Sequence, residues 1–322
     1  MTPCLENFCV SENILKFDIV FSIIIPNKNI PDLLQRCLAS IPRREDVQII
    51  VVDDNSDQDK VDFEHFPGLG DPNVEVIFTK EGKGAGYARN VGLSRAKGKW
   101  LLFADADDYF TDGFIQCLDK YCESDYEIVF FGMYGIIGQT KKESERGQKY
   151  NKLMREAIYN QEYDAYKYKA YSPCAKIIRR SFILENKILF DETKVANDMM
   201  FSLKTAYHAK SIYFDEHKIY TTESRRGSLT ITRTSKANFD RFSVYLRTNV
   251  FLESIAQKKY KVNITLLLLR LINIRDMTYF YKGMELIKEN DINLFLEIFG
   301  FCLSLPYRAA RKIKNKILGR GL

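Results

Sequence analysis

The sequence lacks paired cysteine motifs and any long uncharged apolar run. Its seven cysteines are odd in number and scattered, and no two have CxxC spacing, which argues against a disulfide framework or a structural zinc site and favours a reducing cytoplasm. No uncharged stretch reaches the roughly 18 residues of a membrane-spanning helix, because Glu297 interrupts the longest apolar segment, Ile292 to Leu305. The first residues show no basic stretch followed by an apolar one. We therefore expect neither a secretory signal nor a membrane span.

Several motifs with established chemistry are also missing. No GxxxxGK[ST] phosphate loop occurs, and Gly82, Gly84 and Gly86 do not complete a GxGxxG fingerprint because Arg89 stands at the third glycine position. The three histidines are isolated and form no HExxH pattern. These absences argue against a nicotinamide dehydrogenase and a histidine-based zinc hydrolase. We interpret the three glycines as a flexible lip of a nucleotide pocket, with an ordinary loop as the alternative.

The net charge of +6 is concentrated at the C-terminus. The tail carries six basic residues and no acid, so the remainder of the chain is neutral, which argues against a broad nucleic-acid-binding face. The basic residues are Arg308, Arg311, Lys312, Lys314, Lys316 and Arg320. We expect this basic amphipathic tail to contact an anionic membrane, at the inner face of the cell membrane; the alternative is a solvated terminal helix.

Short apolar, β-branched runs alternate with helical stretches in the first half of the chain. This alternation predicts an α/β fold with a Rossmann-like, mostly parallel sheet flanked by helices, and the continuous hydrophobicity of the runs predicts strands buried on both faces. Strands are predicted at Ile19–Ile25, Val47–Val52, Val74–Phe78, Lys99–Ala104 and Glu127–Phe131. Helices are predicted at Asp32–Ser40, Tyr87–Ala96, Asp112–Cys122 and Asn197–Ala209, and a mobile loop at Gly132–Gln148. We place a catalytic domain at residues 19–233, between an N-terminal extension (1–18) and a helical C-terminal region (234–322).

Polar segments follow three of the predicted strands, where ligands of such sheets bind. They are Pro26–Asn29, Asp53–Ser56 and Asp105–Asp108. Carboxylates at a strand end suit Mg²⁺ or Mn²⁺, which often bind through one or two carboxylates together with substrate phosphates. Taken alone, Asp105–Asp108 is more often an acidic turn that caps the next helix. The surrounding sequence favours the metal site.

The combination of FSIIIPNKN, QIIVVDDNS and the stretch from Gly82 to Phe110 resembles the family 2 glycosyltransferases, which are inverting enzymes of the glycosyltransferase A fold. The pattern of that family is Pro-x-Tyr-Asn, then Asp-Asp-x-Ser, then Ala-Arg-Asn-x-Gly-Leu, then Asp-x-Asp. The resemblance is strong from Ile19 to Phe131 and continues more weakly to Thr230. Four motifs in the right order make a chance match improbable.

The resemblance implies a donor site for a nucleotide sugar. Asp53 or Asp54 would contact the base, Arg89 the base and ribose, Asp105 the ribose, and Asp107 the Mn²⁺ or Mg²⁺ ion on the diphosphate. Lys28 stands where the family has Tyr, so the base contact there would pass to Tyr87 stacking or to the backbone of Pro26 or Asn27. The substrate-binding candidates on this side are Pro26, Asn27, Lys28, Asp53, Asp54, Lys83, Arg89 and Asp105.

The resemblance places the acceptor side in the second half of the domain. Asn197-Asp198 stands where the family has Glu-Asp at the start of a helix, so Asp198 would be the general base; a simple helix cap is the alternative. Arg225 and Arg226 would close over the diphosphate, and a solvated loop is the alternative. The implied reaction transfers a sugar from a UDP-sugar to a saccharide or lipid-linked hydroxyl with inversion, in surface polysaccharide or lipopolysaccharide synthesis.

Three other functions stay open. A nicotinamide dehydrogenase is the weakest of them, because the chain lacks the GxGxxG fingerprint. A sugar nucleotidyltransferase shares a nucleotide-binding sheet and a divalent metal, but it has a glycine-rich basic loop after the first strand, where this chain has PNKN. A non-catalytic nucleotide-sugar-binding module would keep the donor pocket without the base, and Asn197 in place of Glu is compatible with that outcome.

Overall fold

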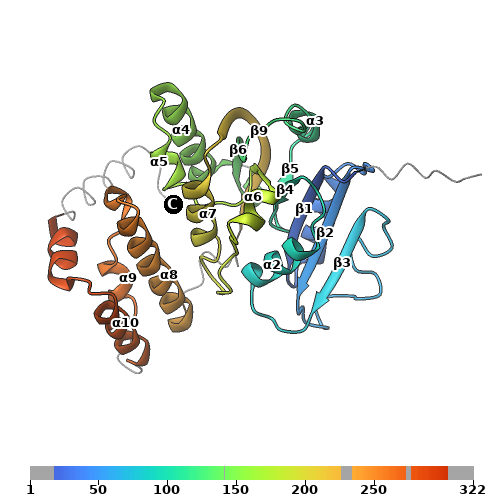
Figure 1. Ribbon diagram of the computed structural model, residues 1–322. Coiled ribbons are helices and arrows are strands. Elements are labelled where there is room, and N and C mark those ends of the chain that lie inside the picture. Colours follow the sequence, from blue (N-terminus) through green and yellow to red (C-terminus); the bar gives the residue numbers. More distant parts are fainter. Residues whose placement is uncertain (1–17, 141, 226–233, 273–276, 304–322) are drawn as a thin grey trace, which may run out of the picture.

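The computed structural model describes residues 18–303 except 141, 226–233 and 273–276. One nine-stranded sheet forms its centre (Figure 1). The strands are β1 (Phe21–Asn27), β2 (Val47–Asp54), β3 (Val74–Thr79), β4 (Trp100–Phe103), β5 (Tyr109–Phe110), β6 (Ile128–Ile137), β7 (Lys142–Glu143), β8 (Lys176–Arg179) and β9 (Ile212–Ser224). Their order is β3-β2-β1-β4-β8-β6-β9-β5, and β7 pairs with β6.

The pairing confirms the mostly parallel sheet. β1 runs parallel to β2 and β4, β2 to β3, and β6 to β9, whereas the shorter pairings of β8 with β4 and β6, of β5 with β9 and of β7 with β6 are antiparallel. The expectation that every early strand is buried on both faces is wrong for β3. β3 forms one edge of the sheet, so it has a neighbouring strand on one side only. Its other residues are half-buried, and Phe78 within it is 41% exposed.

Helices cover both faces of the sheet. Along β1, Ile23 and Ile25 join one apolar cluster and Ile24 the other, as the two-residue period of a strand requires. α1 (Pro31–Ala39) and α3 (Phe114–Asp119) pack in the first cluster. The second cluster contains α2 (Ala85–Arg95), α4 (Glu145–Asn160), α5 (Asp164–Lys167), α6 (Arg180–Glu185) and α7 (Met199–His208).

The segment Gly132–Gln148 is not the loop that its glycines predict. β6 continues to Ile137 because it pairs with β9, then the 3₁₀ turn η1 (Gly138–Thr140) and β7 follow, and α4 begins at Glu145. The pairing partners lie about 85 positions further along the chain. Local composition therefore could not reveal this strand.

The C-terminal region is helical, as predicted. α8 (Ser235–Ser254) starts where the Thr234 hydroxyl accepts a hydrogen bond from the Ala237 amide at 3.2 Å. The 3₁₀ turn η3 (Lys258–Tyr260), α9 (Thr265–Leu269), α10 (Thr278–Glu289) and a helical segment over 294–303 follow. No helix in the part of the chain described above is long and apolar enough to cross a membrane.

Candidate functional site

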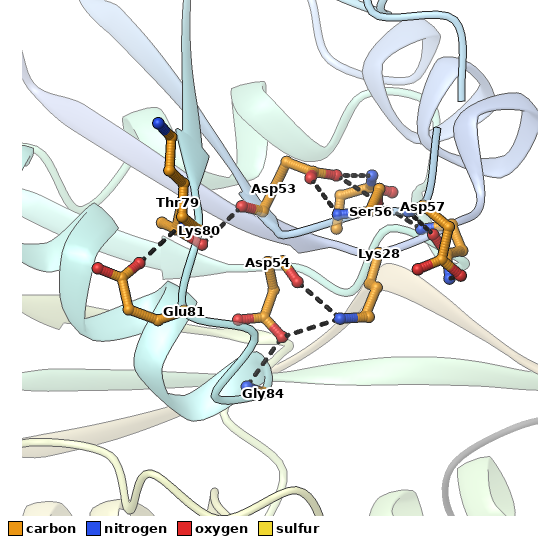
Figure 2. Close-up of polar contacts among 11 residues, drawn as sticks. Lys28, Asp53, Asp54, Ser56, Asp57, Thr79, Lys80, Glu81 and Gly84 are labelled. Carbon is orange, nitrogen blue, oxygen red and sulfur yellow. Dashed lines mark hydrogen bonds and ion pairs between the residues drawn. The ribbon is translucent and has the colours of Figure 1, made fainter. Parts of the chain in front are cut away.

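Asp53 and Asp54 end β2 and point in different directions, as neighbours on a strand do (Figure 2). The Asp53 carboxylate accepts hydrogen bonds from Asn27 Nδ2 at 2.8 Å, from the Ser56 amide at 2.8 Å and from the Ser56 hydroxyl at 2.6 Å. Its side chain is buried. Asp53 thus joins the ends of β1 and β2, and its acceptor capacity is largely used within the protein.

Asp54 has different surroundings. Its Oδ2 accepts from the Gly84 amide at 2.8 Å and lies 3.8 Å from Lys28 Nζ, which also donates to the Asp54 carbonyl (Figure 2). Its Oδ1 is buried and has no hydrogen-bond partner, and burial raises the pKa of this carboxyl. A buried acceptor without a donor is costly unless a ligand supplies one. Of the two candidates for the base contact, Asp54 has the free acceptor.

The glycine segment after β3 is a tight turn into α2, so the interpretation as a flexible lip is wrong for Gly86. Gly82 and Gly84 have φ angles of 59° and 102°, which favour glycine, and Gly84 precedes the first residue of α2. Gly86 is buried within α2, and a Cβ there would lie 1.9 Å from the Asp191 carbonyl oxygen. Between the glycines, Lys83 is exposed, 3.6 Å from Glu192 and over the ring of Tyr87.

The carboxylates of Asp105, Asp107 and Asp108 form a cluster just after β4, with oxygen atoms within 4.8 Å of one another. Burial, and then the charge of Asp105, raise the pKa values of Asp107 and Asp108. Arg225 Nε donates to Asp107 Oδ2 at 2.9 Å, which partly offsets this repulsion.

The donor set of this cluster fits a divalent cation. Mg²⁺ and Mn²⁺ prefer carboxylate oxygens, and a dication would compensate the negative charges that burial and mutual repulsion disfavour. The alternative role as a helix cap receives no support, because α3 begins after Gly113 with no side-chain cap.

Arg89 connects the two halves of the site. It is buried in α2, donates from Nη1 to Asn197 Oδ1 at 2.8 Å and forms an ion pair with Asp105. Its guanidinium also lies over the ring of Phe190, and its Nε is buried without a partner. Because the Asn197 amide is neutral, this hydrogen bond does not cancel the positive charge of Arg89. A glutamate at position 197 would cancel it.

Asp198 lies directly before α7 and is half-buried. Its side chain makes no capping hydrogen bond to the helix, so the structure does not support a cap as its role. Burial raises the pKa of this carboxyl and the charge of Arg89 opposes the shift, while Asp105 adds to it. A carboxylate with a raised pKa is a stronger base than an ordinary aspartate.

Two basic residues near the site were not found from the sequence. Arg146 lies in the first turn of α4, and its charge opposes the rise that burial causes in the pKa values of Asp108 and Asp198. Lys176 begins β8, is 5% exposed and lies over the ring of Phe130 at 5.1 Å. Burial lowers its pKa to about 8, and the charge of the Asp198 carboxylate opposes this shift.

The structure thus brings most of the predicted residues to one edge of the sheet. Pro26 and Asn27 are the buried last residues of β1, and Asn27 Oδ1, Asp54 Oδ1 and Arg89 Nε are three of the seven buried side-chain atoms without a partner among the described residues. Two of these atoms, Asn27 Oδ1 and Asp54 Oδ1, belong to the last residues of neighbouring strands, where ligands of such sheets bind. Arg226 lies outside the described residues.

The fold and this site define an α/β protein with a carboxylate cluster at the carboxyl ends of its parallel strands, the edge where ligands of such sheets bind. The model of the family described as glycosyl transferase family 2 matches residues 22–185. The chain belongs to this family.

Individual relatives agree with this assignment. The poly(ribitol-phosphate) beta-N-acetylglucosaminyltransferase TarS of Staphylococcus aureus is 27% identical over 216 residues, which are 64% of this chain and 36% of TarS. The poly(ribitol-phosphate) beta-glucosyltransferase of Bacillus spizizenii is 30% identical over 59% of this chain and 30% of its own length. The chain thus spans about a third of the length of these curated relatives.

A solved structure confirms the fold. The crystal structure of S. aureus TarS 1-349 in complex with UDP-GlcNAc superposes with a TM-score of 0.61 at 22% identity, covering 84% of this chain and 81% of that one. Both chains share the curled, mostly parallel sheet with flanking helices.

Proposed function

We propose that this chain transfers a sugar from a UDP-sugar to a hydroxyl group of a surface-polysaccharide acceptor, with inversion at the anomeric carbon. The observation that carries the proposal is the link through Arg89, which holds Asp105 of the acid cluster and Asn197 beside Asp198 in one hydrogen-bonded unit. In this proposal, Arg89 thus holds the donor site next to the base. The names of the relatives favour N-acetylglucosamine or glucose as the sugar and a polyol-phosphate polymer as the acceptor.

The donor would lie along the ends of β1, β2 and β4. In this proposal, Asp54 Oδ1 accepts the N–H of uracil, and the backbone at Pro26 and Asn27 borders the base. Lys28 replaces the aromatic residue of the family and neutralises Asp54. A divalent cation held by Asp107, with Asp105 and Asp108 beside it, would stabilise the charge of the departing diphosphate.

Asp198 would act on the acceptor. Its carboxylate takes the proton of the acceptor hydroxyl, the oxygen bonds to the anomeric carbon, and the bond from that carbon to the diphosphate breaks. Attack opposite the leaving group inverts the configuration. Arg225, which contacts Asp107 in this structure, would contact the diphosphate, and so would Arg226 and Lys83.

The test is calorimetric titration of UDP with and without Mn²⁺, followed by transfer or hydrolysis assays with a panel of nucleotide sugars. Asp107→Ala should lose most of the Mn²⁺-dependent gain in UDP affinity, because it removes a carboxylate that our proposal assigns to the ion. Asp112→Ala, an exposed aspartate a few residues further on, is the matched control and should bind like the parent. Equal Mn²⁺ dependence in Asp107→Ala and the parent would refute the metal assignment.

A further inference from the structure

The helical segment 294–303 has an outward side that is almost entirely apolar. It lies at the outer edge of the C-terminal helices, on the side away from the sheet (red in Figure 1). Phe295 is 74% exposed and Leu303 is 66% exposed. The exposed apolar residues of the segment are Phe295, Leu296, Ile298, Phe299, Cys302 and Leu303, which we call the apolar face.

The single charged residue of the segment does not belong to this face. The Glu297 backbone carbonyl accepts from Asn263 Nδ2 at 2.7 Å, and its carboxylate accepts from the Ile264 amide at 3.4 Å, so it faces the adjoining part of the protein. Outside, Phe295 and Phe299 lie one helical turn apart with nearly parallel rings. A contiguous exposed apolar surface of this kind marks a binding surface.

The sequence that follows indicates what covers the apolar face. Residues 304–322 contain six lysines and arginines and no acid, and the rest of the chain is neutral. A second copy of this chain would therefore offer the tail no net opposite charge. A bilayer with anionic lipids satisfies both features, because its hydrocarbon receives the apolar side chains and its headgroups attract the cations.

We infer that the apolar face of residues 295–303 inserts into the interfacial layer of an anionic membrane, next to the basic tail. This inference is independent of the proposed function, because it concerns a surface on the C-terminal helices and not the strand ends that hold the site. The insertion would be peripheral, since the segment lies at the surface and does not span the bilayer.

The experiment is flotation of residues 1–322 with phosphatidylcholine vesicles that contain or lack phosphatidylglycerol. The chain should float with the anionic vesicles, and rising salt should weaken this binding. Phe295→Ser with Phe299→Ser should reduce the binding about tenfold or more, because two aromatic side chains no longer enter the bilayer. Lys312→Gln with Lys314→Gln and Lys316→Gln should cause a similar loss on anionic vesicles only.

Tyr159→Ser is the matched control, since Tyr159 is an 89% exposed aromatic residue in α4, outside the apolar face. It should bind like the parent, and far-ultraviolet circular dichroism of every variant checks the fold. The inference fails if the parent does not float, or if the double phenylalanine variant floats as well as Tyr159→Ser. It also fails if the parent does not bind vesicles but is a dimer by ultracentrifugation, and the double phenylalanine variant is a monomer. A second copy of the chain would then cover the apolar face.

Discussion

Asp198 lies directly before α7, and its side chain makes no capping hydrogen bond to that helix. In our proposal it is the base. Asp198→Asn keeps the size of the side chain and removes its basicity, so UDP binding should stay near parental while transfer slows at least about 100-fold. Because burial raises the pKa of Asp198, the parental rate should rise with pH as this carboxyl loses its proton. Transfer kinetics and UDP titration on the same variant check both statements.

Asp191→Asn is the matched control for this prediction. Asp191 lies in the same segment before α7, but its carboxylate pairs with Arg247 Nη2 at 2.9 Å. Its replacement should leave the transfer rate within a few-fold of the parent. A near-parental rate for Asp198→Asn would exclude Asp198 as the base, and a large loss in Asp191→Asn would move the search there.

Lys176 is a buried cation whose folding cost can be measured. Its pKa is lowered to about 8, whereas an unfolded chain has the ordinary value near 10.4. Below pH 8, Lys176 is protonated in both the native and the unfolded state, so the whole cost of burying the ammonium lowers the free energy of unfolding. As the pH rises from 8 toward 10.4, Lys176 loses its proton in the native state first, and the parent regains stability. Lys176→Met should therefore raise the free energy of unfolding at pH 7 by up to roughly 3 kcal/mol, with a smaller gain at pH 10.

Urea unfolding at the two pH values checks the Lys176 prediction. Lys169→Met, at an exposed lysine, is the control and should change stability little. If Lys176→Met were less stable than the parent at pH 7, the ammonium would be stabilising, and the penalty inferred from its burial would be wrong.

At the scale of elements, the site depends on how closely α2 approaches the segment before α7. Gly86 permits this approach: an added Cβ would meet the Asp191 carbonyl oxygen at 1.9 Å and Asn197 Cβ at 2.9 Å. Gly86→Ala should lower the free energy of unfolding by about 1–3 kcal/mol or more, since backbone must move. It should also slow transfer, because Asn197 carries the contact to Arg89. Thermal unfolding and transfer rates measure the two effects.

Gly300→Ala is the corresponding control in a helical segment. An added Cβ there meets nothing closer than 3.9 Å, and alanine is the better helix former, so stability should be equal or slightly higher. An unchanged melting temperature in Gly86→Ala would show that the two segments separate easily, which would contradict a site held together by this contact.

The elements also show how far the sequence could predict the structure. The strands that end in PNKN, DDNS and DADD were predictable because each is a local apolar run followed by polar residues, and parallel strands share one carboxyl edge. β8 and the far half of β6 were not, because their pairing is with distant segments. The choice between Asp53 and Asp54 also required coordinates, since it depends on which carboxylate the Ser56 amide and hydroxyl bind.

At the scale of the whole molecule, the sheet domain and the C-terminal helices share part of their core. α8, α9 and α10 have an apolar cluster of their own around Phe242 and Leu268. A second cluster, however, joins Leu252 of α8 to Met200 and Leu203 of α7, the helix that follows Asp198. We therefore propose that residues 19–233 and 234–322 are two regions of one cooperative unit, although they differ in architecture.

Leu252→Ala tests this proposal. Leu252 is fully buried, so the truncation should lower the free energy of unfolding by about 2–5 kcal/mol. If the two regions unfold together, helix content measured by far-ultraviolet circular dichroism and UDP binding should be lost in one transition that shifts as a whole. Leu189→Ala, at a 56% exposed leucine, should change stability by no more than about 0.5 kcal/mol. If Leu252→Ala shifted only a helical transition and left the UDP-binding transition in place, the C-terminal helices would be a separately folding domain, because the shared cluster would then not couple them to α7.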